Sequence, residues 1–531
     1  MPDALAPDRF FVTVPPSAMI RGMISRVHGC LTSRPLLTTL FIIGLGALLR
    51  LHGIGADGFW KNELFSLTWI RQPVTWLLGE GMRTETNPPL HYLLLKGWTA
   101  LFGTSEVAAR LPSAIASLAA VAVALRLGQA IERGPAALLG GLFLAITPVQ
   151  IVFSHEARAY ALLPLFAGLA MLGAHRLLRA AAAPGTPPAT AALWFGLGCA
   201  GLLHTHATGA FAVAALGLAC LIALIGTPNP GPVLRRLILA GLAAGLAAAP
   251  VLLALARQSG SDNIAWMPKF GLDTPIIFSR YLLIGPMVRS DFGETAANGQ
   301  LLAEMGLGAV TALTLIVMSG RALRDTAARA VLLIFPLLFI LLVAGMSLSR
   351  PILSPRIILW ISVPICLCAA RILASDLPRV ARIIAGTLYA ACLAVGLWNN
   401  VIDPAQHKPD WRALLAAFPV TIEAGPILVA GPHAAPLGIT FYSEAPVRRP
   451  LRHWIANPAL PVTVADRLER DVSGATTIDT DGLAALVASG RGVVLYLDDD
   501  DEVLIGRLLA PAPWFAAARR SLLPGLTVFT W

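Results

Sequence analysis

Residues 56–113, ADGFWKNELFSLTWIRQPVTWLLGEGMRTETNPPLHYLLLKGWTALFGTSEVAARLPS, concentrate charged side chains within an otherwise apolar part of the chain. Charges are costly inside a bilayer, whereas Trp favours the headgroup layer, so this mixture predicts a long loop on the membrane surface. The hydrophobic helices around it would then form its scaffold. The charged residues are Asp57, Lys61, Glu63, Arg71, Glu80, Arg83, Glu85, Lys96, Glu106 and Arg110, and the interleaved tryptophans are Trp60, Trp69, Trp76 and Trp98.

The composition indicates a polytopic membrane protein. Of the 531 residues, 56% are hydrophobic and 13% are charged, and the mean hydropathy is +0.71, which excludes a soluble globular protein. The net charge of +10 does not indicate a nucleic-acid partner, because the arginines form short clusters between apolar runs. The six cysteines lie in or beside apolar segments, so no disulfide framework or zinc ribbon is expected. No P-loop or dinucleotide motif supports a nucleotide-driven mechanism.

The N-terminal segment, residues 1–35, carries several arginines and lacks a signal-peptide pattern, so we expect it to be cytoplasmic. The first span, near 36–53, then delivers the loop 54–110 to the opposite side, which in a bacterium is the periplasm. The apolar segment Leu90–Phe102 is only about thirteen residues long and contains Lys96. Because a span needs roughly twenty residues, this segment is expected to be a juxtamembrane helix.

The membrane domain is expected over residues 36–401, with about eleven transmembrane helices. After the first, the predicted spans lie near 111–131, 135–154, 160–178, 190–206, 207–226, 237–256, 301–319, 330–347, 355–372 and 383–400.

The arginine distribution supports this topology, because short cytoplasmic loops of membrane proteins are enriched in basic residues. Counting Leu90–Phe102 as a span would invert the bias. The longer periplasmic loop 257–300 adds basic residues and weakens the asymmetry without reversing it. The arginines assigned to short cytoplasmic loops are Arg176, Arg179, Arg235, Arg236, Arg321, Arg324, Arg329, Arg371, Arg379 and Arg382, and those assigned to short periplasmic loops are Arg158, Arg350 and Arg356.

From residue 402 to residue 531 the composition changes, which predicts a small periplasmic α/β domain. The runs GPILVAGPH at 425–433 and RGVVLYLDDD at 491–500 resemble buried strands that end in turns. ADRLERDV at 465–472 and DGLAALVAS at 481–489 resemble short helices. The acidic run Asp498–Glu502 is interpreted as a solvated strand end and not as a cation site.

Three short periplasmic points face the long loop in this topology, and they carry the candidate site residues. They are HEARAY at 155–160, LHTH at 203–206 and SPR at 354–356. Together with the loop they offer carboxylates as general bases, histidines as metal ligands and arginines as phosphate ligands. Structural alternatives remain for single residues: His204 and His206 could be interfacial, and Arg356 could anchor a helix.

At these residues the chain resembles a known family. The order W-x-(D/N)-E, PPL-(H/Y)-Y, E-x-x-x-R-LPS and EAR-x-YAL is similar to that of bacterial glycosyltransferases of the C-type (GT-C) superfamily, near protein O-mannosyltransferases, the lipid A aminoarabinose transferase and rhizobial galacturonosyltransferases. The resemblance covers the chain from about Leu36 to His206. The matching segments are Trp60–Ser66, Pro88–Tyr92, Glu106–Ser113 and His155–Leu162, with weaker matches at His204 and Asp410-Trp411-Arg412.

The resemblance implies transfer of a sugar, with inversion, from a polyprenyl-phosphate donor to a lipid or glycan acceptor at the outer face of the bacterial inner membrane. A carboxylate would accept the acceptor proton, and cations would stabilise the departing phosphate. The family usually has Asp-Glu where this chain has Asn62-Glu63, and an amide cannot act as a base at neutral pH. Glu63 is therefore the expected base, with Asp57 as the alternative.

The remaining candidates come from residues on this side of the membrane, where the opposite charges of Glu156 and Arg158 at a buried span opening need partners. Arg158, Arg356, Arg110 and Lys269 are candidates for binding the donor phosphate, and Trp60, Glu156, Tyr160, His204 and Trp266 for binding the substrate. The family's metal position falls near Glu85, Asn87 and His91, which makes a divalent metal ion a candidate cofactor held by His91 and Glu85.

Two other functions are compatible with the sequence. A lipid or solute transporter would also have many spans, but its charges should line a path at mid-membrane and not gather on one face. A non-catalytic relative that acts as a partner subunit is suggested by Asn62. Incubation of the purified protein with polyprenyl-phosphate sugars distinguishes all three.

Overall fold

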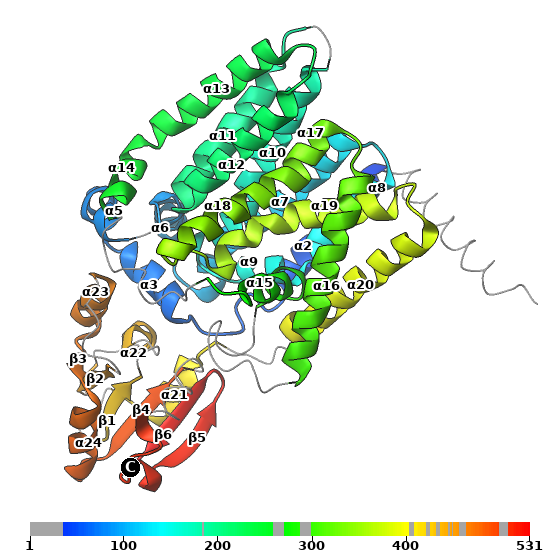
Figure 1. The fold of residues 1–531 in the computed structure, drawn as a ribbon. Coiled ribbons are helices and arrows are strands. Elements are labelled where there is room, and N and C mark those ends of the chain that lie inside the picture. Colours follow the sequence, from blue (N-terminus) through cyan, green and yellow to red (C-terminus); the bar gives the residue numbers. More distant parts are fainter. Residues whose placement is uncertain are drawn as a thin grey trace, which may run out of the picture.

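The computed structural model describes residues 35–85, 87–182, 185–258, 270–286, 299–402, 408–420, 425–431, 436–443, 447–448, 450–455, 464–498 and 508–531. A large helical part precedes a small α/β part, and the latter lies at one end of the former beside helix α3 (Figure 1). The N-terminal segment 1–34 lies outside the described residues. The expected fold class, a polytopic helical protein with a small C-terminal α/β domain, is confirmed.

Six helical segments in the described part are long and apolar enough to cross a membrane, and two bent pairs bring the number to eight. The expected count of about eleven requires that three shorter apolar helices also cross, so it stays a prediction. The six segments are Glu106–Ile131 (α7), Ala159–Ala180 (η2 and α10), Gly299–Ala322 (α16), Thr326–Ser349 (α17, η5 and α18), Pro355–Leu373 (η6 and α19) and Arg379–Ile402 (α20 and η7). The bent pairs are Pro135–Ile146 with Pro148–Ser154 (α8 and α9) and Pro230–Ala247 with Ala249–Arg257 (α13 and α14), and the shorter helices are Pro35–Leu51 (α2), Ala189–Thr205 (α11) and Gly209–Leu224 (α12).

The surface loop between α2 and α7 folds into short helices. Its longest is α6 (Leu90–Phe102), the segment expected to be too short to span, and it has 13 residues. One face of α6 buries His91, Tyr92 and Leu95, while Leu94 and Leu101 on the other side are exposed. A helix with one buried and one exposed apolar face suits the membrane surface. The other elements of the loop are α3 (Lys61–Trp69), α4 (Val74–Trp76), η1 (Leu77–Gly81) and α5 (Met82–Thr84).

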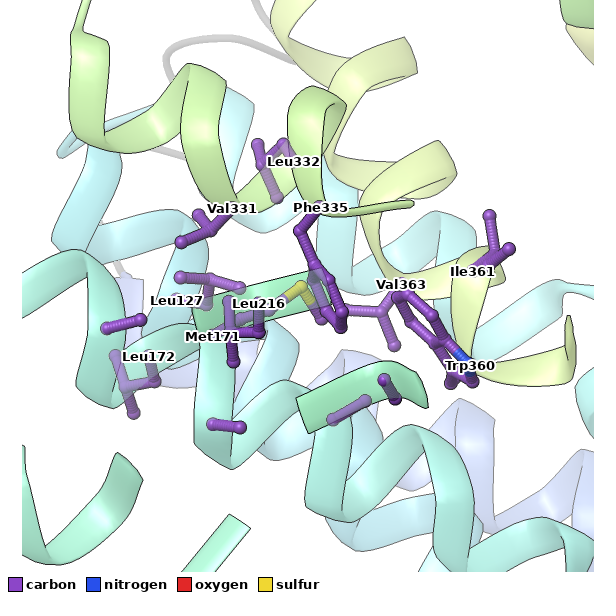
Figure 2. Close-up of a cluster of buried hydrophobic side chains, with 14 of the residues drawn as sticks. Leu127, Met171, Leu172, Leu216, Val331, Leu332, Phe335, Trp360, Ile361 and Val363 are labelled. Carbon is purple, nitrogen blue, oxygen red and sulfur yellow. The ribbon is translucent and has the colours of Figure 1, made fainter. Parts of the chain in front are cut away.

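Close helix packing holds the bundle together. Phe335 of α18 and Trp360 of η6 stack with ring centroids 4.4 Å apart in the largest hydrophobic cluster, as Figure 2 shows. A Cβ at Gly173 or Gly198 would collide with the backbone of the facing helix, so these residues let α10 and α11 touch. Small residues at such contacts are typical of membrane bundles, where dense packing replaces the hydrophobic effect.

A buried arginine stabilises the break between α8 and α9. Pro148 lacks an N–H and bends this pair by 51°. Arg50, at the end of α2, is 1% exposed and donates hydrogen bonds to the carbonyl oxygens of Ala145 (2.8 Å) and Leu144 (3.4 Å). Its own carbonyl oxygen lies 2.9 Å from Nε2 of His155. Arg50 thereby fixes the turn that follows α9.

The C-terminal domain is built on one mixed six-stranded sheet with the order β3-β2-β1-β4-β6-β5. The central strands β1 and β4 are parallel and buried along their whole length, as their apolar sequences predict. Of the acidic run expected at a strand end, Asp498 directly follows β4 and the remainder lies outside the described residues. The strands are β1 (Ile427–Ala430), β2 (Leu451–Trp454), β3 (Thr476–Ile478), β4 (Val493–Leu497), β5 (Arg519–Leu523) and β6 (Leu526–Thr530). The helices are α21 (Trp411–Ala417), α22 (Pro436–Tyr442), α23 (Val464–Ser473), α24 (Thr480–Ala488) and η10 (Phe515–Ala517).

Candidate active site

Glu63, on α3, lies at the centre of a buried hydrogen-bond network. Its side chain is 0% exposed. Oε1 accepts hydrogen bonds from Nε of Arg110 at 2.8 Å and from the backbone N–H of Ala157 at 2.9 Å. Oε2 accepts from Nη2 of Arg110 at 2.9 Å, from Nζ of Lys408 at 3.0 Å and, at 3.4 Å, from the backbone N–H of Trp60. The carboxylate thus joins α3 to α7, to the turn after α9 and to the segment that leads into the C-terminal domain.

This environment makes Glu63 a strong acid. Burial alone would raise its pKa, but the charges of Lys408 and Arg110 and the hydrogen bonds to the carboxylate lower the pKa to about 2. A general base works best when its pKa lies near the working pH and its oxygen is within reach of the acceptor hydroxyl. The geometry therefore does not favour the base role expected of Glu63, because its oxygens are already occupied by the protein's own donors.

Arg110, on α7, has all five of its N–H donors engaged inside the protein. Besides the two bonds to Glu63, Nη1 donates to the carbonyl oxygens of Ile54 (2.9 Å) and Asp57 (3.0 Å). Nη2 also donates to the carbonyl oxygen of Gly58 at 2.8 Å. The phosphate-binding role expected of Arg110 is corrected by this geometry, since Arg110 instead fastens the start of the surface loop to α3. Asp57 takes part in the network through its backbone carbonyl oxygen.

Lys408 is a site residue that the sequence analysis missed. Its Nζ donates to Oε2 of Glu63 at 3.0 Å and to the carbonyl oxygen of His155 at 2.7 Å. Burial lowers the pKa of Lys408, an effect that the charges of Glu63 and Glu156 partly oppose. Its position two residues before Asp410-Trp411-Arg412, the weaker match to the family pattern, is the sequence feature that could have indicated it.

The first helices of the C-terminal domain pack directly against the surface loop. Nε1 of Trp411 donates to the carbonyl oxygen of Phe59 at 2.7 Å, and the Tyr442 hydroxyl accepts from the backbone N–H of Phe59 at 2.8 Å. The same hydroxyl donates to Oε1 of Glu106 at 2.9 Å, which also accepts from Arg412 at 2.6 Å. These contacts place Lys408 at the site and keep it there.

Arg158 follows the turn after α9 and lies against α3. It is 8% exposed, and its Nη1 donates to the carbonyl oxygen of Asn62 at 3.3 Å and to Oγ of Ser66 at 3.2 Å. Its guanidinium carbon lies 5.9 Å from the centre of the Tyr160 ring. Burial alone would lower the pKa of Arg158, but the hydroxyls of Tyr92 and Tyr160 raise it, so the side chain stays charged. Asn62 is half-buried and contacts Arg158 through its backbone.

Three buried polar atoms of the candidate site residues have no hydrogen-bond partner among the described residues: Nε1 of Trp60, Oε2 of Glu156 and Nε of Arg158. Burial raises the pKa of Glu156, although the charges of Lys408 and Arg356 oppose this. The guanidinium carbon of Arg356 lies 4.9 Å from the centre of the Trp60 ring. Because a buried polar atom without a partner costs free energy, this arrangement suits a site that a polar ligand completes.

The connection at 203–206 carries two histidines with different surroundings. Nδ1 of His204 lies 2.8 Å from the carbonyl oxygen of Ala200 in its own helix. His206 instead lies beside Tyr160, with ring centroids 6.3 Å apart, and burial together with the charge of Arg158 lowers its pKa to about 4. The geometry therefore brings His206 close to Tyr160 and Arg158, while Nδ1 of His204 is engaged within its own helix. Lys269 and Trp266 lie outside the described residues.

The described residues do not fit the expected metal ligands. Nε2 of His91 lies 3.1 Å from the carbonyl oxygen of Ala157 and therefore carries the proton, which leaves only Nδ1 with a lone pair. Oε1 of Glu85 accepts two hydrogen bonds from Asn87. No group of three or more His, Cys, Asp or Glu side chains with metal-binding geometry occurs in the part of the chain that the structure describes.

Comparison with known proteins agrees with the motifs. Residues 86–254 match the family model described as dolichyl-phosphate-mannose-protein mannosyltransferase. The crystal structure of ArnT from Cupriavidus metallidurans bound to undecaprenyl phosphate matches with a TM-score of 0.52 at 13% identity, covering 92% of this chain and 97% of that one. Its apo structure matches with a TM-score of 0.52 at 14% identity and the same coverage. No curated protein sequence matches the chain.

A more distant match is the protein O-mannosyltransferase complex Pmt1-Pmt2 of S. cerevisiae bound to the sugar donor. The identity is 18%, the TM-score is 0.34, and the match covers 46% of this chain and 36% of that one. The resemblance indicated by the sequence motifs agrees with the family-model match over residues 86–254 and with the similar fold of ArnT.

Proposed function

Because the chain has the fold of GT-C glycosyltransferases, we propose that it transfers a sugar from a polyprenyl-phosphate-linked donor to a lipid or glycan acceptor. ArnT of similar fold is seen with undecaprenyl phosphate, which supports a lipid-phosphate carrier. The lack of a nucleotide-binding motif in the sequence agrees with such a donor. The expected location, at the periplasmic face of a bacterial inner membrane, belongs to the same proposal.

The observation that carries the proposal is the cluster of charged side chains around Glu63 and Glu156. Four basic side chains, those of Arg110, Arg158, Arg356 and Lys408, act on two carboxylates, Glu63 and Glu156. With both carboxylates ionised, four positive and two negative charges leave an excess of two positive charges. An excess of positive charge favours binding of the anionic donor phosphate and of the polyprenyl phosphate that leaves.

Within this proposal, Glu156 is the general base. Its raised pKa and its free Oε2 suit a group that accepts the proton of the acceptor hydroxyl. The acceptor oxygen then bonds to the anomeric carbon while the bond from that carbon to the phosphate oxygen breaks, which inverts the configuration. Arg158 and Arg356 stabilise the charge that develops on the leaving phosphate.

Glu63 has a different role in this mechanism. Its carboxylate holds Arg110, Lys408 and the Ala157 N–H in fixed positions, so the catalytic groups do not have to reorganise during the reaction. The substitution of Asn62 for the family's usual Asp then need not abolish catalysis, because the proton acceptor lies on the turn after α9 and not on α3.

A second candidate function is that of a non-catalytic partner subunit. Two observations favour it. Asn62 is an amide, and both carboxylate oxygens of Glu63 already accept hydrogen bonds from the protein, so α3 has no free carboxylate among these two positions. A subunit of this kind would retain lipid-phosphate binding and lack turnover.

The test is an assay of purified full-length protein in lipid nanodiscs with synthetic polyprenyl-phosphate sugars, in which release of polyprenyl phosphate is measured. We expect turnover in the wild type and a loss on the order of 10² to 10⁴ in Glu156→Gln, with donor binding kept. Glu80→Gln, on an exposed side chain of the same surface loop, is the matched control. Donor binding without turnover in the wild type would instead support the partner subunit.

A further inference from the structure

A second ionic site lies at the end of the helical bundle far from Glu156. The short connections expected on the cytoplasmic side meet there, and ion pairs join them: Arg179 with Asp325 at 3.0 Å and Arg371 with Glu132 at 3.0 Å. Helix α20 begins at this end with Arg379, and its continuation leads towards Lys408 at the candidate active site. Arginines outnumber acidic residues at this end, so its surface is basic.

An open groove of about 360 Å³ lies between α19 and α20 at this basic end. Its lining residues on α20 recur with helical spacing and form one stripe along the first turns, and Leu373 of α19 forms the facing wall. Along α20 the stripe begins with the basic residues Arg379 and Arg382 at the end of the bundle, and it continues with apolar and small residues towards the middle of the helix. The lining residues are Leu373, Arg379, Arg382, Ile383, Gly386 and Thr387.

The two arginines of the groove differ from their neighbours. Arg371 and Arg324, on the other side of the α19–α20 connection, form ion pairs with acidic residues. Arg379 and Arg382 form no ion pair with any residue that the structure describes. Nη1 of Arg382 donates to the carbonyl oxygen of Leu373 at 3.3 Å, while its Nε is buried and has no partner among the described residues.

The groove is kept open by a glycine. A Cβ at Gly386 would lie 2.9 Å from Cδ2 of Leu373, so a larger side chain would fill the space between the helices. From Arg379 to Thr387 the helix rises roughly 12 Å, at about 1.5 Å per residue. This length accommodates a lipid headgroup beside the arginines and the first part of an acyl chain beside Ile383 and Gly386.

We propose that the groove between α19 and α20 binds an anionic phospholipid of the membrane leaflet at the basic end of the protein. The phosphate would lie against the guanidinium groups of Arg379 and Arg382, and the acyl chain would lie against Ile383, Gly386 and Leu373. Basic pockets between membrane helices are suited to such headgroups because the cytoplasmic leaflet carries negative lipids. The site is separate from the polyprenyl-phosphate site, and the proposal does not depend on the proposed function.

The test measures lipid binding to purified full-length protein by native mass spectrometry, with phosphatidylglycerol and phosphatidylcholine of identical acyl chains. We expect the wild type to prefer phosphatidylglycerol. The double variant Arg379→Gln/Arg382→Gln should bind it about thirty-fold more weakly, since each basic residue near an anionic lipid contributes roughly 1 kcal/mol. Gly386→Leu should also weaken binding at unchanged charge, because it fills the groove.

Two controls make the result decisive. Arg235→Gln/Arg236→Gln removes two charges from α13 at the same end of the protein and should change phosphatidylglycerol binding less than twofold. Thermal unfolding midpoints verify that each variant is folded, and Arg379→Gln alone replaces the double variant if that one does not fold. Equal weakening by the α13 variant, no effect of Gly386→Leu, equal binding of phosphatidylcholine, or displacement of the lipid by inorganic phosphate at millimolar concentration would each overturn the proposal.

Discussion

Replacing Glu63 by Gln distinguishes a residue that organises the site from one that moves a proton. The change keeps the shape of the side chain but removes the charge that Arg110 and Lys408 neutralise at 2.8 and 3.0 Å. A pKa lowered from 4.5 to about 2 corresponds to about 3 kcal/mol of stabilisation at neutral pH. This agrees with the roughly 3 to 5 kcal/mol that the loss of one partner of a buried ion pair costs. We therefore expect Glu63→Gln to lower the thermal unfolding midpoint by several degrees.

The pH dependence of this effect has a definite sign. Because the pKa of Glu63 is lower in the folded protein than in the unfolded chain, its stabilisation is present above about pH 4.5 and is lost as the pH falls towards 2. The difference in unfolding midpoint between wild type and Glu63→Gln should stay constant from pH 7 to about pH 5.5 and then shrink. The measurement is differential scanning fluorimetry of purified protein from pH 7 down through the interval between pH 4.5 and pH 2.

Glu156→Gln is the matched comparison. It replaces a buried carboxylate that has an unpartnered oxygen, so it should leave the midpoint unchanged or raise it slightly while it abolishes most of the turnover. If Glu63→Gln instead keeps the wild-type midpoint and loses turnover, Glu63 is the base and the assignment to Glu156 is refuted.

Three further outcomes are expected. Lys408→Met should lower turnover roughly 10- to 100-fold, because it removes charge-assisted hydrogen bonds to Glu63 and His155 worth about 1.5 to 3 kcal/mol. Unchanged turnover in the nanodisc assay would show that Lys408 takes no part in catalysis. Arg158→Ala should reduce turnover far more than the amount of folded protein, because a cation at the leaving phosphate contributes chiefly in the transition state; equal losses would make Arg158 a structural residue. Reporter fusions test the topology: those after Arg179, Arg236, Arg324 and Arg379 should be cytoplasmic and one after Trp411 periplasmic, and a cytoplasmic signal from the last would contradict the expected orientation.

Features that depend on local sequence could be predicted well. The length of Leu90–Phe102 and the lysine within it identified a helix too short to span, and the structure contains that helix with the same bounds. The apolar runs around 427 and 493 identified the two central strands of the C-terminal sheet. Both predictions rest on hydrophobic patterns over a few consecutive residues, which tertiary contacts seldom override.

The roles within the site could not be predicted in the same way. The partners of Glu63 lie 47 and 345 residues away along the chain, at Arg110 and Lys408, and no pattern near residue 63 indicates them. The sequence therefore left the direction of its pKa shift open. The opposite charges of Glu156 and Arg158 at a buried span opening predict that both side chains need partners, but only the structure reveals which of their atoms lack one.

The contact between Glu63 and Lys408 has a consequence for the biosynthesis of the protein. A chain that is being inserted into the membrane presents Glu63, Arg110 and the turn after α9 long before residue 408 leaves the ribosome. Until then the Glu63 carboxylate is paired with Arg110 but not with Lys408. The backbone of Phe59 likewise lacks its hydrogen bonds with Trp411 and Tyr442. The pocket is thus completed only after the last membrane helix has been made, so a prematurely terminated chain can insert correctly and still lack an assembled site.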